Sequence, residues 1–293
     1  MTIQQPIELR FDVKGMTFAA QEWGDPEGIP VLALHGWLDN SNSFYRLAPL
    51  LNGVRLVAID KAGHGESDHR SGFTPYGIWE DVAEIYSISQ QLGWERFSLL
   101  GHSRGGVISC LVAGTFPDVI DSVLLLDSIV PEPLDETKVP EQLQQSILDH
   151  SRQRSQPIYP DIERIIKARQ SSYWPLSRDA AEALLRRGIR REPDGYTWSS
   201  DPRLLNASPL KLSLGQVKAF LQRLQMPVKL LVAEEGLYRR FDQLESLLQQ
   251  FPMIDVKHCS GGHHFHMEQQ VDVVAAEINQ FYQTIFSQGG VNA

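Results

Sequence analysis

The sequence of 293 residues has few of the features that mark secreted, membrane or nucleic-acid-binding proteins. Its two cysteines, Cys110 and Cys259, are too few for a disulfide framework and lie in apolar segments, so we expect reduced thiols in a core. No stretch reaches the roughly 18 apolar residues of a membrane span, and the N-terminus has no apolar signal core. A net charge of −9 argues against a phosphate backbone as partner. We therefore expect a cytoplasmic protein without membrane or nucleic-acid partners; its oligomeric state stays open.

The chain does contain short apolar runs that alternate with amphipathic stretches, in an ordinary globular composition of 42% hydrophobic and 22% charged residues. Continuous apolar runs are typical of strands buried on both faces of a parallel sheet. The predicted strands are 7–14, 16–24, 30–36, 55–60, 96–100, 122–127, 228–234 and 255–259. The predicted helices include 43–51, one that starts at Thr74–Pro75, one from about Tyr238 to Gln250, and a last one over 268–286. This pattern predicts an α/β fold with a mostly parallel, eight-stranded sheet flanked by helices.

The alternation stops at Pro131 and resumes near residue 211. Between them the chain is polar, helical in pattern and interrupted by prolines, with no convincing buried strand. We therefore expect a sheet domain made of residues 1–130 and 211–293, with residues 131–210 inserted as a helical cap. Insertions of this kind usually lie over a functional edge. The basic run that includes Arg187 and Arg190 is expected to form a solvated helix face.

The segment 98–109 reads SLLGHSRGGVIS, and it places Ser103 between glycines where a predicted strand becomes a predicted helix. Gly-x-Ser-x-Gly in this context is typical of a nucleophile elbow, in which a strained turn presents the serine hydroxyl at the carboxyl edge of the sheet. The alternative is that Ser103 only fills a tight corner. The strand–turn–helix context favours a nucleophile.

A serine nucleophile needs a base, and in this arrangement the base follows the last strand. The segment 258–269, HCSGGHHFHMEQ, contains four of the nine histidines. We predict His263 as the base, with His264 as the alternative. A zinc site built from His263, His264 and His266, with His258 or Cys259 as a further ligand, is a weaker interpretation because no matching pair of ligands occurs elsewhere. No metal or cofactor is expected.

The acid that orients the base has two candidate positions. Asp127 ends the buried run 122–127, and Glu234 and Glu235 follow the run that starts at Val228. For the oxyanion we predict two backbone N–H groups, that of Arg104 after the serine and that of Trp37 after His35-Gly36.

These motifs resemble the α/β-hydrolase superfamily over nearly the whole chain. The matching pieces are His35-Gly36, DKAGHGES (60–67), GHSRGG (101–106) and SGGHHFHME (260–268). Within the superfamily the chain is most similar to serine hydrolase-like proteins, whose layout resembles haloalkane dehalogenases. That layout implies Asp127 as the acid and a structural turn at 60–67. Dehalogenases and epoxide hydrolases carry an aspartate nucleophile, so Ser103 argues against a halide site.

The sequence therefore predicts a serine hydrolase that cleaves a small ester-like acyl substrate through Ser103, His263 and Asp127. Trp174 and Trp198 of the predicted cap are expected to contact this substrate. Hydrolysis of a C–C or amide bond by the same residues is the first alternative. A ligand receptor or inactive scaffold with little turnover is the second.

Overall fold

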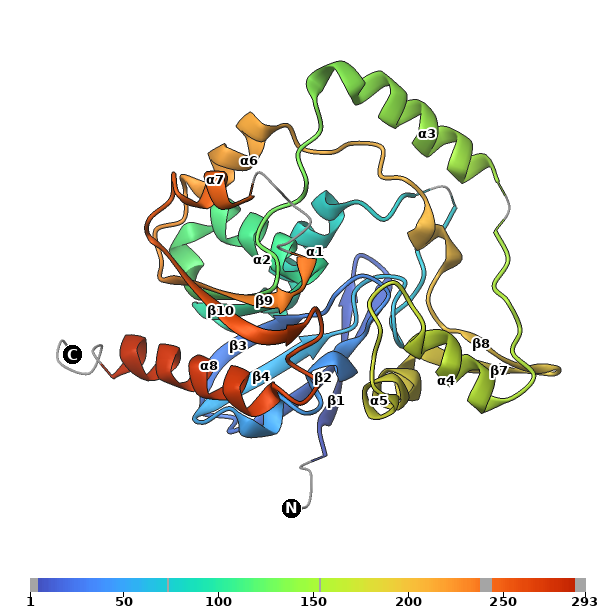
Figure 1. The fold of residues 1–293 in the computed structure, drawn as a ribbon, viewed down its shortest axis with the longest axis horizontal. Coiled ribbons are helices and arrows are strands. Elements are labelled where there is room, and N and C mark those ends of the chain that lie inside the picture. The colour runs from blue at the N-terminus through green and yellow to red at the C-terminus, as the bar shows by residue number, and fades with distance from the viewer. Residues whose placement is uncertain (1–4, 73, 153, 238–243, 288–293) are drawn as a thin grey trace.

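The structure is a computed structural model that describes residues 5–72, 74–152, 154–237 and 244–287 (Figure 1). Eight strands form one sheet in the order β1-β2-β4-β3-β5-β6-β9-β10. Their bounds are β1 Ile7–Val13, β2 Met16–Gly24, β3 Ile29–Leu34, β4 Val54–Ile59, β5 Phe97–His102, β6 Ile120–Leu126, β9 Val228–Glu235 and β10 Ile254–Gly262. Only β2 pairs antiparallel with its neighbours β1 and β4, and the other pairs are parallel. The predicted eight-stranded, mostly parallel sheet is confirmed.

Alternate residues of the central strands pack into two different cores, because successive side chains of a strand point to opposite faces. Leu32 and Leu34 of β3 join one core, whereas Val31 and Ala33 join the other. The first core is completed by α1 (Ile78–Gln91), α2 (Arg104–Thr115), α6 (Leu214–Leu221) and α7 (Leu244–Leu248), and the second by α8 (Val271–Phe286). Both faces of the sheet are thus covered, which explains why all six residues of β5 are buried.

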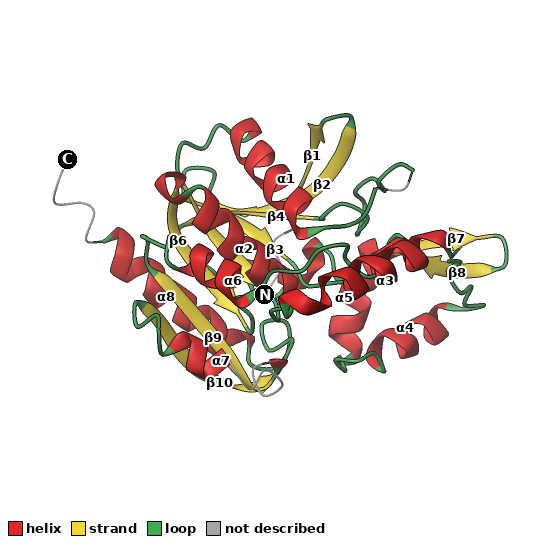
Figure 2. Cartoon of the chain, turned by 90° about the horizontal axis from the view of Figure 1, so that it is seen from above, coloured by secondary structure: helices red, strands yellow, loops and turns green. Residues whose placement is uncertain are grey.

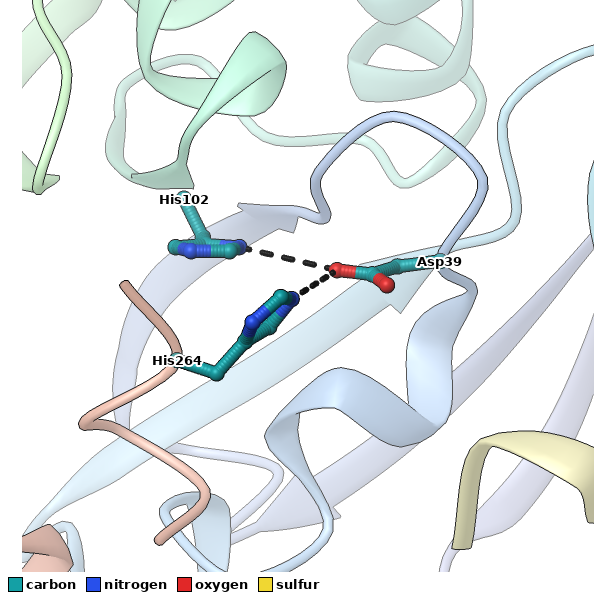
Figure 3. Close-up of side chains that lie close together, drawn as sticks. All are labelled: Asp39, His102 and His264. Carbon is teal, nitrogen blue, oxygen red and sulfur yellow. Dashed lines mark hydrogen bonds and ion pairs between the residues drawn. The ribbon is translucent and has the colours of Figure 1, made fainter. Parts of the chain in front are cut away.

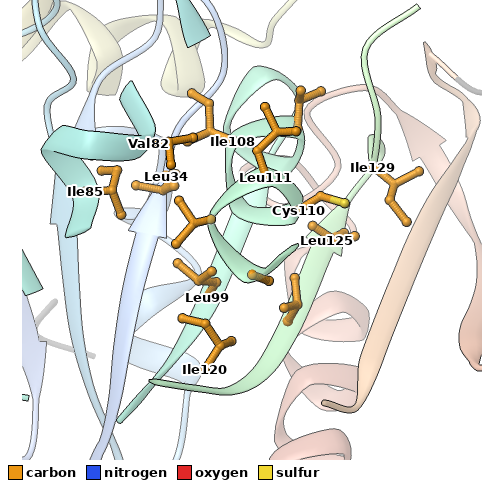
Figure 4. Packing of buried hydrophobic residues seen from close by; sticks show 14 of the residues in the cluster. Leu34, Val82, Ile85, Leu99, Ile108, Cys110, Leu111, Ile120, Leu125 and Ile129 are labelled. Atoms are coloured by element: carbon orange, nitrogen blue, oxygen red, sulfur yellow. The ribbon is translucent and has the colours of Figure 1, made fainter. Parts of the chain in front are cut away.

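Helix α2 packs along the centre of the first core (Figure 4). Its Ile108, Cys110 and Leu111 are buried against strand residues such as Leu99 and Leu125. Cys110 and Cys259 are both buried and free, as the sequence predicts.

Some predicted helix bounds are wrong. The stretch 43–51 forms two 3-10 turns, η1 (Ser41–Phe44) and η2 (Ala48–Leu50), in place of one helix. Helix α1 begins at Ile78 and not at Thr74–Pro75, because the Tyr76 hydroxyl donates to Asp201 at 2.7 Å and accepts from the Arg70 amide. Of the helix predicted over 238–250, residues 238–243 lie outside the described residues.

The insertion, residues 131–210, lies to one side of the sheet (Figure 2). Its elements are η4 (Glu136–Lys138), α3 (Val139–Ser151), α4 (Ile162–Gln170), α5 (Arg178–Gly188), β7 (Ile189–Glu192), β8 (Gly195–Trp198) and η5 (Pro202–Leu205). A further 3-10 turn, η3 (Pro117–Val119), precedes β6. The antiparallel hairpin β7–β8 departs from the expected all-helical insertion. The segments that enter and leave the insertion are joined, since the Leu134 amide donates to the Leu212 carbonyl at 2.8 Å.

Arg187 of α5 connects the insertion to the core. Its side chain is 4% exposed and donates to Asp60 after β4 and to Glu8 of β1. The Asp60 carboxylate is fully buried and also accepts from the amides of Ser41 and Glu66. The expectation of a solvated basic face is therefore wrong for Arg187, although Arg190 is half exposed and pairs only with Glu192 at 2.9 Å.

In the part of the chain that is described, no helix has the length and apolar character needed to cross a bilayer.

Candidate active site

Ser103 lies at a tight corner between β5 and α2. Its backbone has φ 53° and ψ −121°, a region that a residue with a side chain rarely adopts. The neighbouring glycines permit this corner: a Cβ on Gly101 would lie 2.5 Å from the carbonyl oxygen of Gly105, and a Cβ on Gly105 would overlap the carbonyl of Leu34. The corner predicted from the sequence is therefore present.

Asp127 follows β6, the strand beside β5, and its backbone also has a positive φ of 54°. Its carboxylate accepts three hydrogen bonds: Oδ1 from the Ala233 amide at 3.0 Å, and Oδ2 from the Leu237 amide at 2.7 Å and from His263 Nδ1 at 2.6 Å. These bonds offset the cost of burying an ionised carboxylate. Glu234 and Glu235, the alternative acids, are exposed.

His263 lies in the loop that follows β10, and Gly261 lets the chain turn there with φ 110°. Gly262 has open space around its Cα, so close packing does not require a glycine at that position. Burial lowers the pKa of His263 below its ordinary value, although the Asp127 hydrogen bond opposes this effect. The ring is therefore neutral at pH 7 and has a lone pair available for a proton.

The other histidines of this loop have different partners. His264 Nε2 lies 3.3 Å from Asp39 Oδ2, and His266 Nε2 lies 2.9 Å from the Ser43 hydroxyl. Of the histidines in this loop, His263 is the one hydrogen-bonded to Asp127 in the described structure.

A cavity of about 500 Å³ opens between the sheet edge and the insertion. Its lining residues are Gly36, Trp37, Leu38, Asp39, His102, Ser103, Arg169, Ser172, Tyr173, Trp174, His263 and His264. Ser103 and His263 thus face one space. The indole of Trp174 stacks on the His263 ring with 4.5 Å between centroids and 29° between planes.

Trp198 is not among the residues that line this cavity. It packs edge-on against Tyr159 with 5.7 Å between ring centroids, and it lines a neighbouring hollow of about 310 Å³. Leu38 and Arg169 border both spaces.

The two predicted oxyanion donors lie on this cavity's rim or close to it. Arg104 is the first residue of α2, where backbone N–H groups have no intrahelical acceptor, and its side chain pairs with Asp81 at 2.7 Å. Trp37 lines the cavity, and its indole donates to the Leu204 carbonyl of the insertion at 3.1 Å. The next residue, Leu38, has a φ of 60°.

Lys61 is hydrogen-bonded to the turn that contains Gly36. Its buried ammonium group donates to the carbonyl of His35 and lies 3.4 Å from that of Gly36. Burial lowers the pKa of Lys61 to about 7. His64 of the same 60–67 turn is also buried, and its Nδ1–H donates to the Ala62 carbonyl at 3.0 Å, in line with a structural turn.

A second polar cluster, made of Asp39, His102, His264 and Arg169, was not found by reasoning from the sequence. Figure 3 shows Asp39, His102 and His264. Arg169 Nη2 donates to Asp39 Oδ1 at 2.5 Å across the boundary between insertion and core. Asp39, His102 and His264 are the described residues whose atoms are grouped closely enough to hold a metal ion. The sequence signal that could have pointed to this cluster is the acidic residue Asp39, which follows soon after the His35-Gly36 motif.

Comparisons with known proteins identify the family of this fold. A family model described as the alpha/beta hydrolase fold matches residues 29–269. The chain is 34% identical to the human serine hydrolase-like protein 2, over 94% of each chain. A hypothetical protein of Pseudomonas aeruginosa PAO1 has a solved structure with 38% identity and a TM-score of 0.90, covering 96% of this chain and 99% of that one.

A further solved structure, the thioesterase domain from the curacin biosynthetic pathway, is 26% identical with a TM-score of 0.83, and covers 94% of this chain and 99% of that one. The resemblance to serine hydrolase-like proteins that the motifs imply is confirmed by these relatives. The chain therefore belongs to the α/β-hydrolase family.

Proposed function

We propose that the protein is a serine hydrolase that cleaves a small ester-like acyl substrate. One observation carries this proposal: His263 is hydrogen-bonded to Asp127 at 2.6 Å and faces the same cavity as Ser103, whose strained backbone is that of a nucleophile elbow. A buried acid, a neutral imidazole and a presented hydroxyl are the three parts that nucleophilic acyl transfer needs.

In the first half of the reaction, the Ser103 oxygen attacks the substrate carbonyl while His263 accepts the hydroxyl proton. Because Nδ1–H of His263 donates to Asp127, the lone pair of the neutral ring is on Nε2, and Nε2 takes this proton. The carbonyl oxygen becomes negative and is stabilised by the amides of Trp37 and Arg104. The bond to the leaving group then breaks, and that group takes the proton from His263.

In the second half, a water molecule attacks the acyl-enzyme and gives a proton to His263. The bond between the acyl group and Ser103 breaks, the proton returns to the serine oxygen, and the acid product leaves. No step requires a cofactor.

The cavity supports a small-molecule substrate. A volume of about 500 Å³ suits a small molecule, and Trp174 supplies an apolar wall beside His263. The curacin thioesterase domain, which this chain resembles, extends the range of acyl donors worth testing to thioesters.

The experiment is labelling by a fluorophosphonate probe together with turnover of acyl esters and thioesters of graded chain length. The wild type is expected to react at Ser103, and Ser103→Ala is expected to lose both labelling and turnover. Ser109→Ala, in which a buried serine of α2 loses its bond to the Gly105 carbonyl, is the matched control and should retain both. Labelling without any turnover would support a receptor, and full hydrolysis by Ser103→Ala would overturn the proposal.

A further inference from the structure

Two histidine rings approach one carboxylate oxygen next to the candidate active site (Figure 3). Asp39 Oδ2 lies 3.3 Å from His264 Nε2 and 3.7 Å from His102 Nδ1. The three side chains come from the loop after β3, the end of β5 and the loop after β10, and each is at least nine-tenths buried. Water is therefore largely excluded from this cluster.

The hydrogen bonds around His102 leave one of its nitrogens without a partner. Its Nε2 lies 2.9 Å from the carbonyl oxygen of His263, which can only accept, so Nε2 carries the proton. In the neutral ring, the Nδ1 lone pair then faces the Asp39 carboxylate, and Nδ1 has no hydrogen-bond partner. A lone pair that faces a carboxylate in a buried site is unfavourable unless a positive charge lies between them.

Asp39 Oδ2 lies 3.3 and 3.7 Å from the two imidazole nitrogens, close to the separations around a tetrahedral metal ion, and all three atoms lie within 4.8 Å of one another. Zinc–nitrogen and zinc–oxygen bonds of about 2.0–2.1 Å, at tetrahedral angles, separate neighbouring ligand atoms by about 3.3–3.4 Å. We propose that Asp39 Oδ2, His102 Nδ1 and His264 Nε2 bind a divalent cation of the zinc class, and that the bound cation inhibits the enzyme. Imidazole and carboxylate ligands in this number suit zinc and cobalt.

The surroundings of the three ligands support this site. A metal-binding histidine usually donates its second ring N–H to a carbonyl or carboxylate, as His102 does to His263. In its contact with the Asp39 carboxylate, which can only accept, His264 carries its proton on Nε2. His264 must move its proton from Nε2 to Nδ1 on binding, and Nδ1 has no partner that this movement would disturb.

The two oxygens of the Asp39 carboxylate have different partners. Arg169 contacts Oδ1 and leaves Oδ2 to the two imidazoles.

Inhibition follows from the position of the cluster, and this part rests on the proposed function. The ring of His263 lies 4.6 Å from that of His102 and 5.2 Å from that of His264, measured between centroids. His263 becomes positively charged when it accepts the Ser103 proton. A divalent cation this close opposes that charge, so the attack by Ser103 slows.

The binding test uses the chelator-treated protein, with Co²⁺ as a spectroscopic probe and Zn²⁺ as competitor. We expect one Co²⁺ per chain, with the visible absorption of a tetrahedral ion, displaced by Zn²⁺. Asp39→Asn and His264→Gln should weaken binding by more than the roughly 10- to 100-fold that loss of an outer-shell partner costs. His258→Gln, which alters an exposed histidine of β10, is the matched control and should bind as the wild type does.

Arg169→Gln provides a variant that is expected to gain affinity, by roughly tenfold, because it removes a positive charge beside Asp39. A variant that only loosened the fold would lose affinity, so this result separates electrostatics from misfolding. The proposal is overturned if Co²⁺ does not bind, if binding ignores Asp39→Asn and His264→Gln, or if Arg169→Gln weakens it.

The inhibition test measures how fast the fluorophosphonate labels Ser103 with and without Zn²⁺. Labelling should slow as the site fills, at the Zn²⁺ concentration that displaces Co²⁺, and should not slow in His264→Gln. Unchanged labelling beside confirmed Co²⁺ binding would overturn the inhibitory role. Failure of the proposed function appears differently, as absent labelling without any metal, while Co²⁺ binding is unaffected.

Discussion

The carboxylate of Asp127 accepts three hydrogen bonds, and only one of them comes from His263. Asp127→Asn keeps the shape but replaces one oxygen by an NH₂ group, which cannot hold the imidazole in the tautomer with its lone pair toward Ser103. We expect ester turnover to fall by several hundredfold or more, since a similar change in a well-known triad costs roughly 10⁴. Turnover of one activated ester, with circular dichroism as a check of folding, measures this.

Glu234→Gln and Glu235→Gln are the matched controls, because both glutamates are exposed and are the last two residues of the neighbouring strand β9. Each should stay within about tenfold of the wild type. If a glutamate variant loses most of its turnover while Asp127→Asn keeps nearly normal turnover, the acid of the triad lies at the end of β9 and not at Asp127.

Lys61 gives the fold a pH dependence that can be measured. Its pKa is about 7 in the folded chain, because burial disfavours the charged amine, and about 10.5 when the chain is unfolded. Between these values the unfolded state binds the extra proton, so the free energy of unfolding rises with pH; below pH 7 and above pH 10.5 the contribution is constant.

We therefore expect the unfolding free energy of the wild type, relative to Lys61→Met, to increase by about 2 kcal/mol from pH 7.5 to 9.5. Urea denaturation at several pH values measures it. A difference that stays flat across this window would show that Lys61 keeps an ordinary pKa.

The position of Ser103 could be predicted from the sequence because its whole context is local: a buried strand, two glycines at fixed spacing and a helix within 12 residues. The pairing of Asp39 with Arg169 could not, because their positions are 130 residues apart and neither lies in a motif. The sequence offers His264 as an alternative base or as one ligand of a histidine zinc site, and it does not pair His264 with Asp39. Its partner Asp39 depends on how the loop after β3 meets the loop after β10, which only the folded chain shows.

At the scale of elements, the two tryptophans of the insertion that we expected to contact the substrate lie at different cavities. Trp174 stacks on His263 at the Ser103 cavity, and Trp198 of β8 lines the neighbouring hollow. Trp174→Ala should shift the preferred acyl chain length, because removing the indole enlarges the cavity beside the reacting carbonyl. Probe labelling should change less.

The measurement is kcat/KM across an ester series, and Trp198→Ala serves as the paired variant with a smaller expected shift. Identical chain-length profiles for Trp174→Ala and the wild type would argue that Trp174 only packs against His263.

The sheet was predictable because its strands are continuous apolar runs, whereas the hairpin β7–β8 was not. Strand β7 has the sequence IRRE and none of its residues is buried, so hydrophobic pattern does not mark it. Its turn residues Pro193-Asp194-Gly195 were a usable signal for a tight turn, and Gly195 has φ 142°. The hairpin is also held from outside, by paired hydrogen bonds between the backbones of Tyr159 and Tyr196.

At the scale of the molecule, Arg187 forms a buried charged link between insertion and core. Arg187→Met leaves the buried Asp60 carboxylate without its cation, and breaking a buried pair in this way typically costs about 3–5 kcal/mol. Arg190→Met removes an exposed pair with Glu192 and should cost less than about 1 kcal/mol.

Thermal or urea unfolding of the two variants tests this difference. Equal stability losses would mean that the Asp60 pair contributes no more than a surface pair does. The sequence could not separate the two arginines, since they are three residues apart; the packing of α5 beside η1, which brings Arg187 to Asp60, distinguishes them.

The hydrogen bond between Leu134 and Leu212 ties together the points where the chain leaves the core and returns to it. The insertion is therefore attached to the core as a loop whose two ends are already held together. Lengthening a closed loop is cheap, about 0.6 kcal/mol for each doubling. Ser103, Asp127 and His263 all lie outside residues 134–212, so a segment of different length and chemistry can be exchanged between these two anchors while the frame that holds the three residues stays in place.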